Sequence, residues 1–256
     1  MQRPNEAELL AAGVLKSDRG NVFAAQVLGR ALLMQNRPAE AIVPLERTAR
    51  RSDDPAIETL LAGALAAAGR RDEALDQLRK TTARRPAFAP AFLELGGQIS
   101  RLGRLDEAVA ILESGLALAP DAADLQMELG YVQLKRNKRA EARALFLQVL
   151  AATPERHDAL LALAKVMALD GEYAAAADLY RRALGMRPDD IVTRNNLGIC
   201  LLEMGQRDAG ETSLRTATRG AHQMAGQSIT ALASVSHGRF FLRPSAAAKF
   251  LQVEQP

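Results

Sequence analysis

The sequence predicts an all-α chain built from repeated pairs of antiparallel helices. Three observations support this fold class: prolines recur at a fixed interval, small and large residues alternate in step with them, and the composition favours helices. Hydrophobic residues make up 48% of the chain, whereas aromatic residues make up only 4% and tryptophan is absent. A core with so few large rings must use close-packed alanine and leucine, which are strong helix formers.

The proline spacing sets the length of one repeat. Pro86, Pro120, Pro154 and Pro188 are separated by three equal intervals of 34 residues. A fixed period of this length is typical of an array of helical units. Because proline lacks a backbone N–H and cannot continue a helix, each of these prolines marks the end of the second helix of a pair.

Small and large residues keep the same register inside each interval. The first small residue, such as Gly96, follows a leucine, and a second small residue such as Ala108 stands twelve positions later. Small residues allow two helix axes to approach closely, and large residues fill the space beside them. The large residue lies sixteen positions after the first small one, at Leu45, Leu78, Leu112, Phe146, Tyr180 and Leu214.

This register predicts six units, two end segments and short turns within each pair. Glycine can take a positive φ at little cost, so we expect Gly69, Gly103, Gly171 and Gly205 to form such turns. Residues 1–21 contain a helix that matches the second half of a unit and is expected to be an N-terminal capping helix. Residues 225–256 are expected to form a C-terminal capping helix and an apolar tail. The six units are residues 22–55, 56–88, 89–122, 123–156, 157–190 and 191–224.

The pattern resembles the tetratricopeptide repeat family over roughly residues 5 to 224. The resemblance implies an α-α superhelix, a solenoid of six helical-hairpin repeats in which the first helix of each pair lines a concave face. It also implies a non-catalytic scaffold or adaptor for protein–protein interaction. Some members hold a C-terminal carboxylate with a lysine and asparagine clamp, but the matching positions here do not supply those residues.

The register also fixes which side chains of the first helices point into the expected groove. Most of them are small or apolar, and cations lie late in the helices. This combination favours an apolar peptide or helix of a partner protein, with acidic residues on its flanks. The expected groove residues are Gln26, Arg30, Thr59, Gly63, Leu93, Gly97, Arg101, Met127, Tyr131, Lys135, Leu161, Lys165, Asn195 and Ile199.

Two other functions fit the same sequence. The chain could be the recognition module of a larger enzyme. Alternatively, a basic edge along the hairpin turns could bind RNA or another polyanion, although the edge lacks aromatic residues that stack on bases and nucleic acid is therefore the less favoured partner. The basic edge consists of Arg37, Arg70, Arg71, Arg104, Arg136, Lys138, Arg139 and Arg207.

The C-terminal tail is too apolar for a disordered segment. It contains Phe240, Phe241, Leu242 and Phe250. Something must cover these side chains. The tail either folds back onto the last helices or docks onto another chain, which leaves self-association open.

The sequence lacks motifs that carry chemistry. Its three histidines, His157, His222 and His237, do not have the spacing of metal ligands, so we expect no metal, no cofactor and no enzyme activity. The lone cysteine, Cys200, cannot form an internal disulfide. The formal charge of +3 is too balanced to indicate a nucleic acid or membrane partner. With no visible targeting segment or membrane span, a cytoplasmic location is expected.

Overall fold

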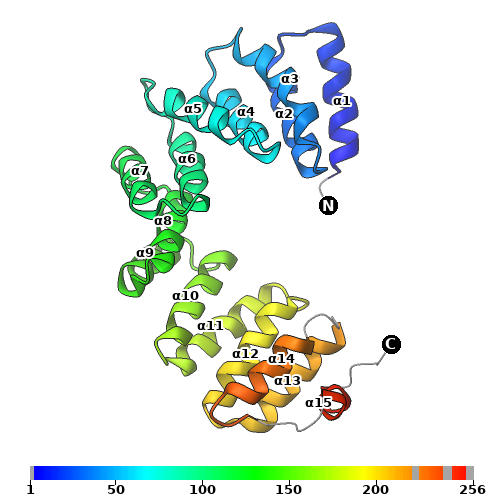
Figure 1. Cartoon of the computed structure of the whole chain (residues 1–256), viewed down its shortest axis with the longest axis vertical. Helices are drawn as coiled ribbons and strands as arrows, with labels where there is room; N and C mark the ends of the chain where they lie inside the picture. The colour runs from blue at the N-terminus through cyan, green and yellow to red at the C-terminus, as the bar shows by residue number, and fades with distance from the viewer. Residues whose placement is uncertain (1–2, 221–224, 239–243, 252–256) are drawn as a thin grey trace. The chain divides into compact units, whose positions relative to one another are not determined.

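The computed structural model describes residues 3–220, 225–238 and 244–251. These residues form fifteen α-helices and no strand, so the all-α fold class is confirmed (Figure 1). By its internal contacts the chain divides into two compact units, Met1–Asn137 and Lys138–Pro256.

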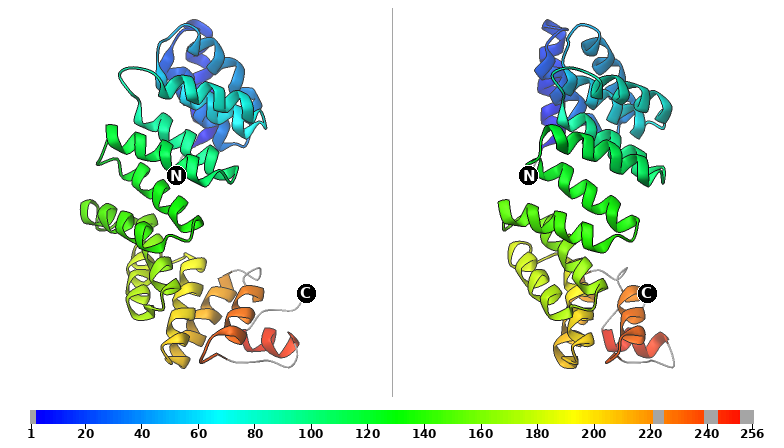
Figure 2. Two further views of the ribbon diagram at one scale, coloured as in Figure 1. Left: turned by 60° about the vertical axis from the view of Figure 1, so that its left-hand side comes forward. Right: turned by 90° about the vertical axis from the view of Figure 1, so that its left-hand side faces the viewer.

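The first unit begins with a single helix and continues as antiparallel pairs. Its first helices α2, α4, α6 and α8 pack on one another in sequence, and each second helix packs on the first helix that follows it or precedes it (Figure 2). The helices are α1 (Pro4–Ser17), α2 (Val22–Met34), α3 (Pro38–Ala49), α4 (Pro55–Ala67), α5 (Arg71–Thr82), α6 (Ala89–Arg101), α7 (Leu105–Leu118) and α8 (Ala123–Lys135).

The second unit contains two complete pairs and a smaller closing pair. Its last two helices pack on α12 and α13, the pair that precedes them (Figure 1). The helices are α9 (Arg139–Ala152), α10 (His157–Leu169), α11 (Tyr173–Met186), α12 (Ile191–Glu203), α13 (Arg207–Gly220), α14 (Ala225–Ser234) and α15 (Pro244–Leu251).

Several helices begin with a side-chain cap. The Asn21 side chain accepts a hydrogen bond from the Ala24 amide at 2.9 Å, and Asp190 accepts from the Thr193 amide at 3.1 Å. Such caps satisfy amides that have no partner inside the helix. Burial of Asp190 opposes its ionisation, but the hydrogen bonds from Thr193, together with the nearby His157 and the Val192 amide, hold the pKa of Asp190 below its ordinary value.

The seams of two pairs, α6 with α7 and α12 with α13, show the predicted match of small and large residues. A Cβ added to Gly96 of α6 would lie 2.6 Å from Leu112 of α7, and Leu112 is fully buried. The same holds for Gly198 of α12, where the added Cβ would lie 2.9 Å from Leu214 of α13. Glycine therefore brings the two helices of a pair close enough for one leucine to fill the seam.

The hairpin turns use two residue types. Gly69, Gly103, Gly171 and Gly205 adopt positive φ, as the sequence predicts. In the turns after α2 and α8 the positive φ falls on an asparagine instead, at 58° for Asn36 and 59° for Asn137. Asparagine is among the few residues other than glycine that tolerate this conformation.

The lone thiol, Cys200 on α12, is buried, and burial raises its pKa to about 11. Thiol reagents attack the thiolate, so we expect almost no labelling of the folded chain at neutral pH and increasing labelling only as the pH approaches that value. The folded protein binds this proton more tightly than the unfolded chain, so its contribution to stability is lost as the pH rises through the pKa. Counting reactive thiols with and without denaturant tests this expectation. Labelling of native Cys200 at the rate of the denatured chain would contradict it.

Candidate functional site

A depression opens between two neighbouring first helices of the first unit, α4 and α6. Its cavity volume is about 380 Å³. Ligand pockets usually measure ~300–1,000 Å³, so this one has room for one or two side chains of a ligand. It is lined by Gly63, Ala66 and Ala67 from α4, by Arg71 and Leu75 from α5, and by Glu94, Gln98, Arg101 and Leu102 from α6 and its C-cap.

Small and apolar residues make the depression open. A Cβ added to Gly63 would meet nothing within 4 Å, so the glycine leaves space above α4. Leu75 is buried beneath the depression, whereas Leu102 at its margin is exposed. An apolar side chain from a ligand can therefore contact carbon atoms here instead of water, which is favourable.

The polar groups of the depression leave one cation available. The carboxylate of Glu94 accepts hydrogen bonds from Gln98 at 2.8 Å and from Arg101 at 3.4 Å. Arg71, in contrast, has no carboxylate partner within the described part of the chain. An incoming carboxylate can therefore pair with Arg71 without displacing an existing ion pair, and an arginine fork suits a carboxylate well.

The structure brings two predicted groove residues, Gly63 and Arg101, into this one depression. Other predicted residues lie on the same row of first helices in the first unit. Arg30 is exposed on α2 and Tyr131 is exposed on α8. Lys135 is exposed on α8 and donates to the Ser100 hydroxyl of α6 at 2.8 Å.

The remaining predicted residues of the first unit are less accessible. Gln26 is half-buried and donates to Asp54 at 3.3 Å. Thr59 and Leu93 are half-buried, and Gly97 is buried. Met127 is only 3% exposed, so its side chain is not an accessible contact for a ligand.

In the second unit, the predicted groove residues also differ in how exposed they are. Lys165 is exposed, and Leu161 and Ile199 are half-buried. Asn195 is buried and accepts a hydrogen bond from the Ser228 hydroxyl of α14 at 2.8 Å. The amide expected to face a ligand is therefore in contact with the closing pair of helices.

The described part of the apolar tail folds back on its own unit. Phe250 is half-buried against the cluster of Leu202, Leu214, Leu232 and Leu251. The Arg215 guanidinium lies 4.2 Å from the centroid of its ring, within the range of a cation–π contact. Phe240, Phe241 and Leu242 lie outside the described residues.

Sequence reasoning missed the contribution of α5 to the depression. The repeat register predicts groove residues on the first helices alone, whereas Arg71 and Leu75 come from a second helix. One signal was present, because Arg71 belongs to the basic edge. The burial of Leu75 next to the small residues of α4 could not be read from the register.

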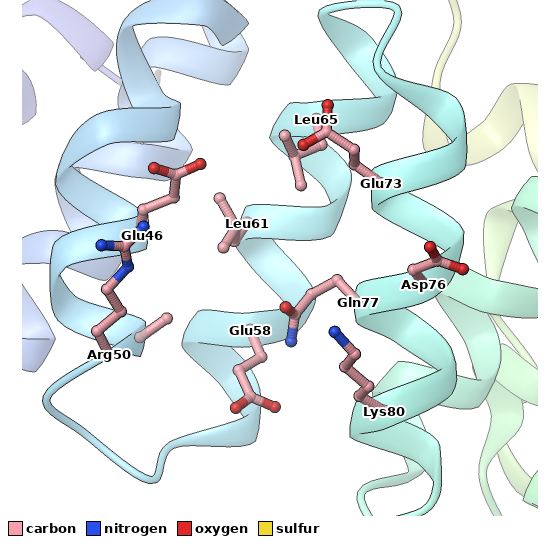
Figure 3. A pocket seen from close by; sticks show the side chains of 10 residues that line it. Glu46, Arg50, Glu58, Leu61, Leu65, Glu73, Asp76, Gln77 and Lys80 are labelled. Carbon is pink, nitrogen blue, oxygen red and sulfur yellow. The ribbon is translucent and has the colours of Figure 1, made fainter.

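A second depression, of about 370 Å³, lies over α4 between α3 and α5. Figure 3 shows Leu61 and Leu65 pointing into it from α4, with charged side chains on both sides. Its carboxylates have partners within the chain: Glu73 accepts a hydrogen bond from Arg70 at 2.6 Å, which lowers the pKa of Glu73. Glu58 accepts one from the Arg84 guanidinium at 2.8 Å. Arg50 and Lys80 also line this depression. We favour the depression between α4 and α6 as the ligand site because it lies between two first helices and carries the small residues Gly63, Ala66 and Ala67.

Most of the basic edge is neutralised by neighbouring carboxylates. A polyanion would have to compete with these ion pairs for the same cations, which weakens the basis for its binding. The pairs are Arg37 with Glu40, Arg70 with Glu73, Arg104 with Glu107, Arg136 with Asp106, Lys138 with Glu141, Arg139 with Asp170 and Arg207 with Glu211.

Within residues 3–220, 225–238 and 244–251, no cluster of three His, Cys, Asp or Glu side chains is placed to bind a metal ion. None of the helices in these ranges has the length and apolar character needed to cross a membrane.

Solved structures with the same fold have low sequence identity. A thermophilic TPR protein of Thermus thermophilus, TTC0263, is 25% identical, with a TM-score of 0.59 over 70% of this chain and 97% of its own. Cut9–Hcn1 of the APC/C is 20% identical, with a TM-score of 0.73 over 90% of this chain and 46% of the other. The human IFIT1 dimer with m7Gppp-AAAA is 18% identical, with a TM-score of 0.70 over 90% of this chain and 58% of the other.

Sequence comparison identifies the repeats directly. No protein with a curated description matches the chain. Family models described as Tetratricopeptide repeat match residues 59–123, 100–139 and 127–191 in one case and 167–231 in another. These matches cover more than half of the sequence and fall on helical pairs in which a small residue packs against a large one. The chain therefore belongs to the tetratricopeptide repeat family.

Proposed function

We propose that the chain is a non-catalytic interaction scaffold or adaptor whose partner is another protein. It binds an apolar peptide or helix with acidic flanks, and the depression between α4 and α6 is the centre of the site. The observation that carries this proposal is the meeting of an open floor at Gly63 with the cation of Arg71, which has no carboxylate partner among the described residues.

Both parts of the site contribute to recognition. Burying one leucine or phenylalanine side chain of the ligand on the floor is worth about 1.5–3 kcal/mol. A hydrogen bond from a guanidinium to a carboxylate adds about 1.5–3 kcal/mol. Because Arg30 and Lys135 lie on neighbouring first helices of the same unit, they extend the preference for acidic residues beyond the depression.

The first test fills the floor of the site. Gly63→Leu adds a side chain where a Cβ meets nothing within 4 Å, so the variant should fold and the added side chain should occupy the depression. Peptides selected from a display library against the wild-type chain are expected to carry a large apolar residue beside Asp or Glu. Their dissociation constants, measured by fluorescence anisotropy, should rise at least ~10-fold for Gly63→Leu, which is about 1.4 kcal/mol.

Matched controls separate the site from general effects. Gly185 of α11 also has nothing within 4 Å of an added Cβ, so Gly185→Leu should bind like the wild type. Arg71→Glu should weaken binding, whereas the same reversal at the exposed Arg47 of α3 should not. Unchanged affinity in both Gly63→Leu and Arg71→Glu would reject the site.

Nucleic acid is the alternative ligand, because the human IFIT1 dimer of similar fold was solved with m7Gppp-AAAA. The internal ion pairs of the basic edge favour a protein partner instead. Binding of single-stranded RNA oligonucleotides at several salt concentrations distinguishes the two ligands. Tight binding that falls steeply with salt would favour the polyanion.

A further inference from the structure

Helix α4 contributes to both depressions of the first unit, but with opposite faces. It presents Leu61 and Leu65 to the depression between α3 and α5, and Gly63 to the depression between α4 and α6. An α-helix completes one turn in about 3.6 residues, so Gly63 lies on the side of α4 away from the two leucines. Among the described residues, none lines both depressions. A peptide bound in one depression therefore does not occupy the lining of the other.

Three carboxylates of the depression between α3 and α5 lie on its walls, and each has an arginine of its own chain within ion-pair distance. Glu73 pairs with Arg70 at 2.6 Å between oxygen and nitrogen, and the same guanidinium lies 3.9 Å from Glu46. Asp76 pairs with Arg79 at 3.5 Å. These carboxylates therefore have counter-ions without any contribution from a ligand.

The fourth carboxylate of this depression, Glu58, is only 8% exposed. In the repeat register it takes the place of Phe92 and Leu160, which are buried apolar residues. Its two oxygens accept hydrogen bonds from the Arg84 guanidinium at 2.8 Å and from the Thr81 hydroxyl at 3.0 Å. A buried charge is tolerated when it is paired and hydrogen-bonded, and these two partners meet that requirement. Glu58 is therefore satisfied within its own unit.

Two cations of the same depression have no such partner. Arg50 is the C-cap of α3, and Lys80 lies in the last turn of α5. Figure 3 shows them on opposite sides of the depression, with Glu58 and Gln77 between them. Both side chains are exposed, and neither pairs with a carboxylate in the parts of the chain that the structure describes. The charges that lack a counter-ion here are thus positive, which makes the depression complementary to an anion.

We propose that the depression between α3 and α5 is a second peptide site, in which Arg50 and Lys80 hold an Asp or Glu side chain of an acidic peptide from a second partner protein. An arginine fork matches the two oxygens of a carboxylate, and the lysine adds a second positive charge. Ala49, Leu61 and Leu65 line the same depression, so an apolar side chain beside the acidic one contacts carbon atoms.

The positions of the two sites let the scaffold hold two partners at once, one on each side of α4. Simultaneous binding rests on the proposed function of the depression between α4 and α6, whereas the second site does not. A chain with both sites brings two different proteins together, which is the action of an adaptor. The two sites are tested separately below.

The first test selects peptides while the depression between α4 and α6 is filled. A random peptide display library is selected against the full chain that carries Gly63→Leu. The enriched peptides are expected to contain Asp or Glu. Fluorescently labelled synthetic copies should bind the wild type and Gly63→Leu with equal dissociation constants. A selection that returns no binder, or only binders without acidic residues, overturns the proposal.

The second test removes the two cations. Arg50→Gln/Lys80→Gln changes exposed side chains and should fold, and its dissociation constant for the selected peptides should be at least ~10-fold higher than that of the wild type. Arg47→Gln/Arg51→Gln is the matched control, because it removes two exposed cations that line neither depression. This control should bind like the wild type. Unchanged affinity in the first double variant, or an equal loss in both, would reject the site.

The third test asks whether both sites bind at once. Peptides that bind the wild type but not Gly63→Leu belong to the depression between α4 and α6. A saturating amount of such a peptide, unlabelled, should leave the affinity for the labelled acidic peptide unchanged. Displacement would mean that the two peptides share one site, which overturns the proposal. If the selection against the wild type returns only peptides that Gly63→Leu does not affect, the proposed function fails while the second site stands.

Discussion

Replacing Leu112 with alanine should lower the free energy of unfolding by about 2–5 kcal/mol, as is usual for a fully buried leucine. Leu112 fills the seam between α6 and α7 and has no exposed surface. Its truncation removes contacts on both sides and leaves a cavity where Gly96 supplies no side chain to fill it. Denaturation in urea, followed by far-UV circular dichroism, measures the change.

The partner substitution, Gly96→Ala, tests the same seam from the other side. The new Cβ would lie 2.6 Å from Leu112, so the variant should be destabilised by about 1–3 kcal/mol. Combined with Leu112→Ala, the added methyl group occupies part of the cavity, and the double variant should lose less than the sum of the two single losses. Strict additivity would mean that the two residues do not share a seam.

A control substitution at another glycine tests whether the loss of stability in Gly96→Ala is steric. Gly63→Ala introduces its Cβ into open space on a helix of the same type. Because alanine favours helix over glycine by about 1 kcal/mol, this variant should be as stable as the wild type or more stable. If Gly96→Ala also raised stability, the close approach of the two helices would not require a glycine at position 96.

The fold could be predicted largely because packing inside a pair is local in sequence. Gly96 lies on α6 and Leu112 lies on the next helix, α7, with one short turn between the two helices. The spacing of residue types along the sequence therefore determines which side chains meet. Glycine spacing does not predict the turns at Asn36 and Asn137, where asparagine adopts the positive φ. Asparagine at the same register position carries the same signal, because it also tolerates this conformation.

The candidate site could be predicted only in part. The register gives the direction in which a side chain points, but not which other residues pack over it. Gly63 and Arg101 both line the depression, whereas Asn195 is covered by Ser228 from α14. That contact joins residues of two different pairs, and its cause is the packing of α14 on α12. No spacing rule within one repeat contains this information.

The C-terminal residues show the same limit. Helix α14 begins 34 residues after α12, so it continues the period. The sequence predicts a capping helix and an apolar tail here. The small-residue pattern of the repeats is broken in this helix, because Leu232 stands where Gly198 stands one period earlier. Leu232 joins a buried cluster with Leu202 and Leu214.

Replacing Leu251 with alanine should also cost about 2–5 kcal/mol of unfolding free energy. Leu251 ends α15 and is fully buried against Leu202, Leu214 and Leu232. Its carbonyl also accepts a hydrogen bond from the Thr218 hydroxyl at 3.1 Å. Urea denaturation of the full chain, followed by circular dichroism, measures the loss.

The control for this substitution lies on the same helix. Lys249 is exposed, so Lys249→Ala should change stability by no more than about 0.5 kcal/mol. The comparison separates the two roles that the sequence left open for the tail. If α15 docked on another chain instead, Leu251→Ala would weaken association and leave the unfolding of the isolated chain unchanged. If α15 closes the last pair, as its packing in the second unit indicates, the loss appears in the isolated chain because the cluster around Leu232 is part of its own core.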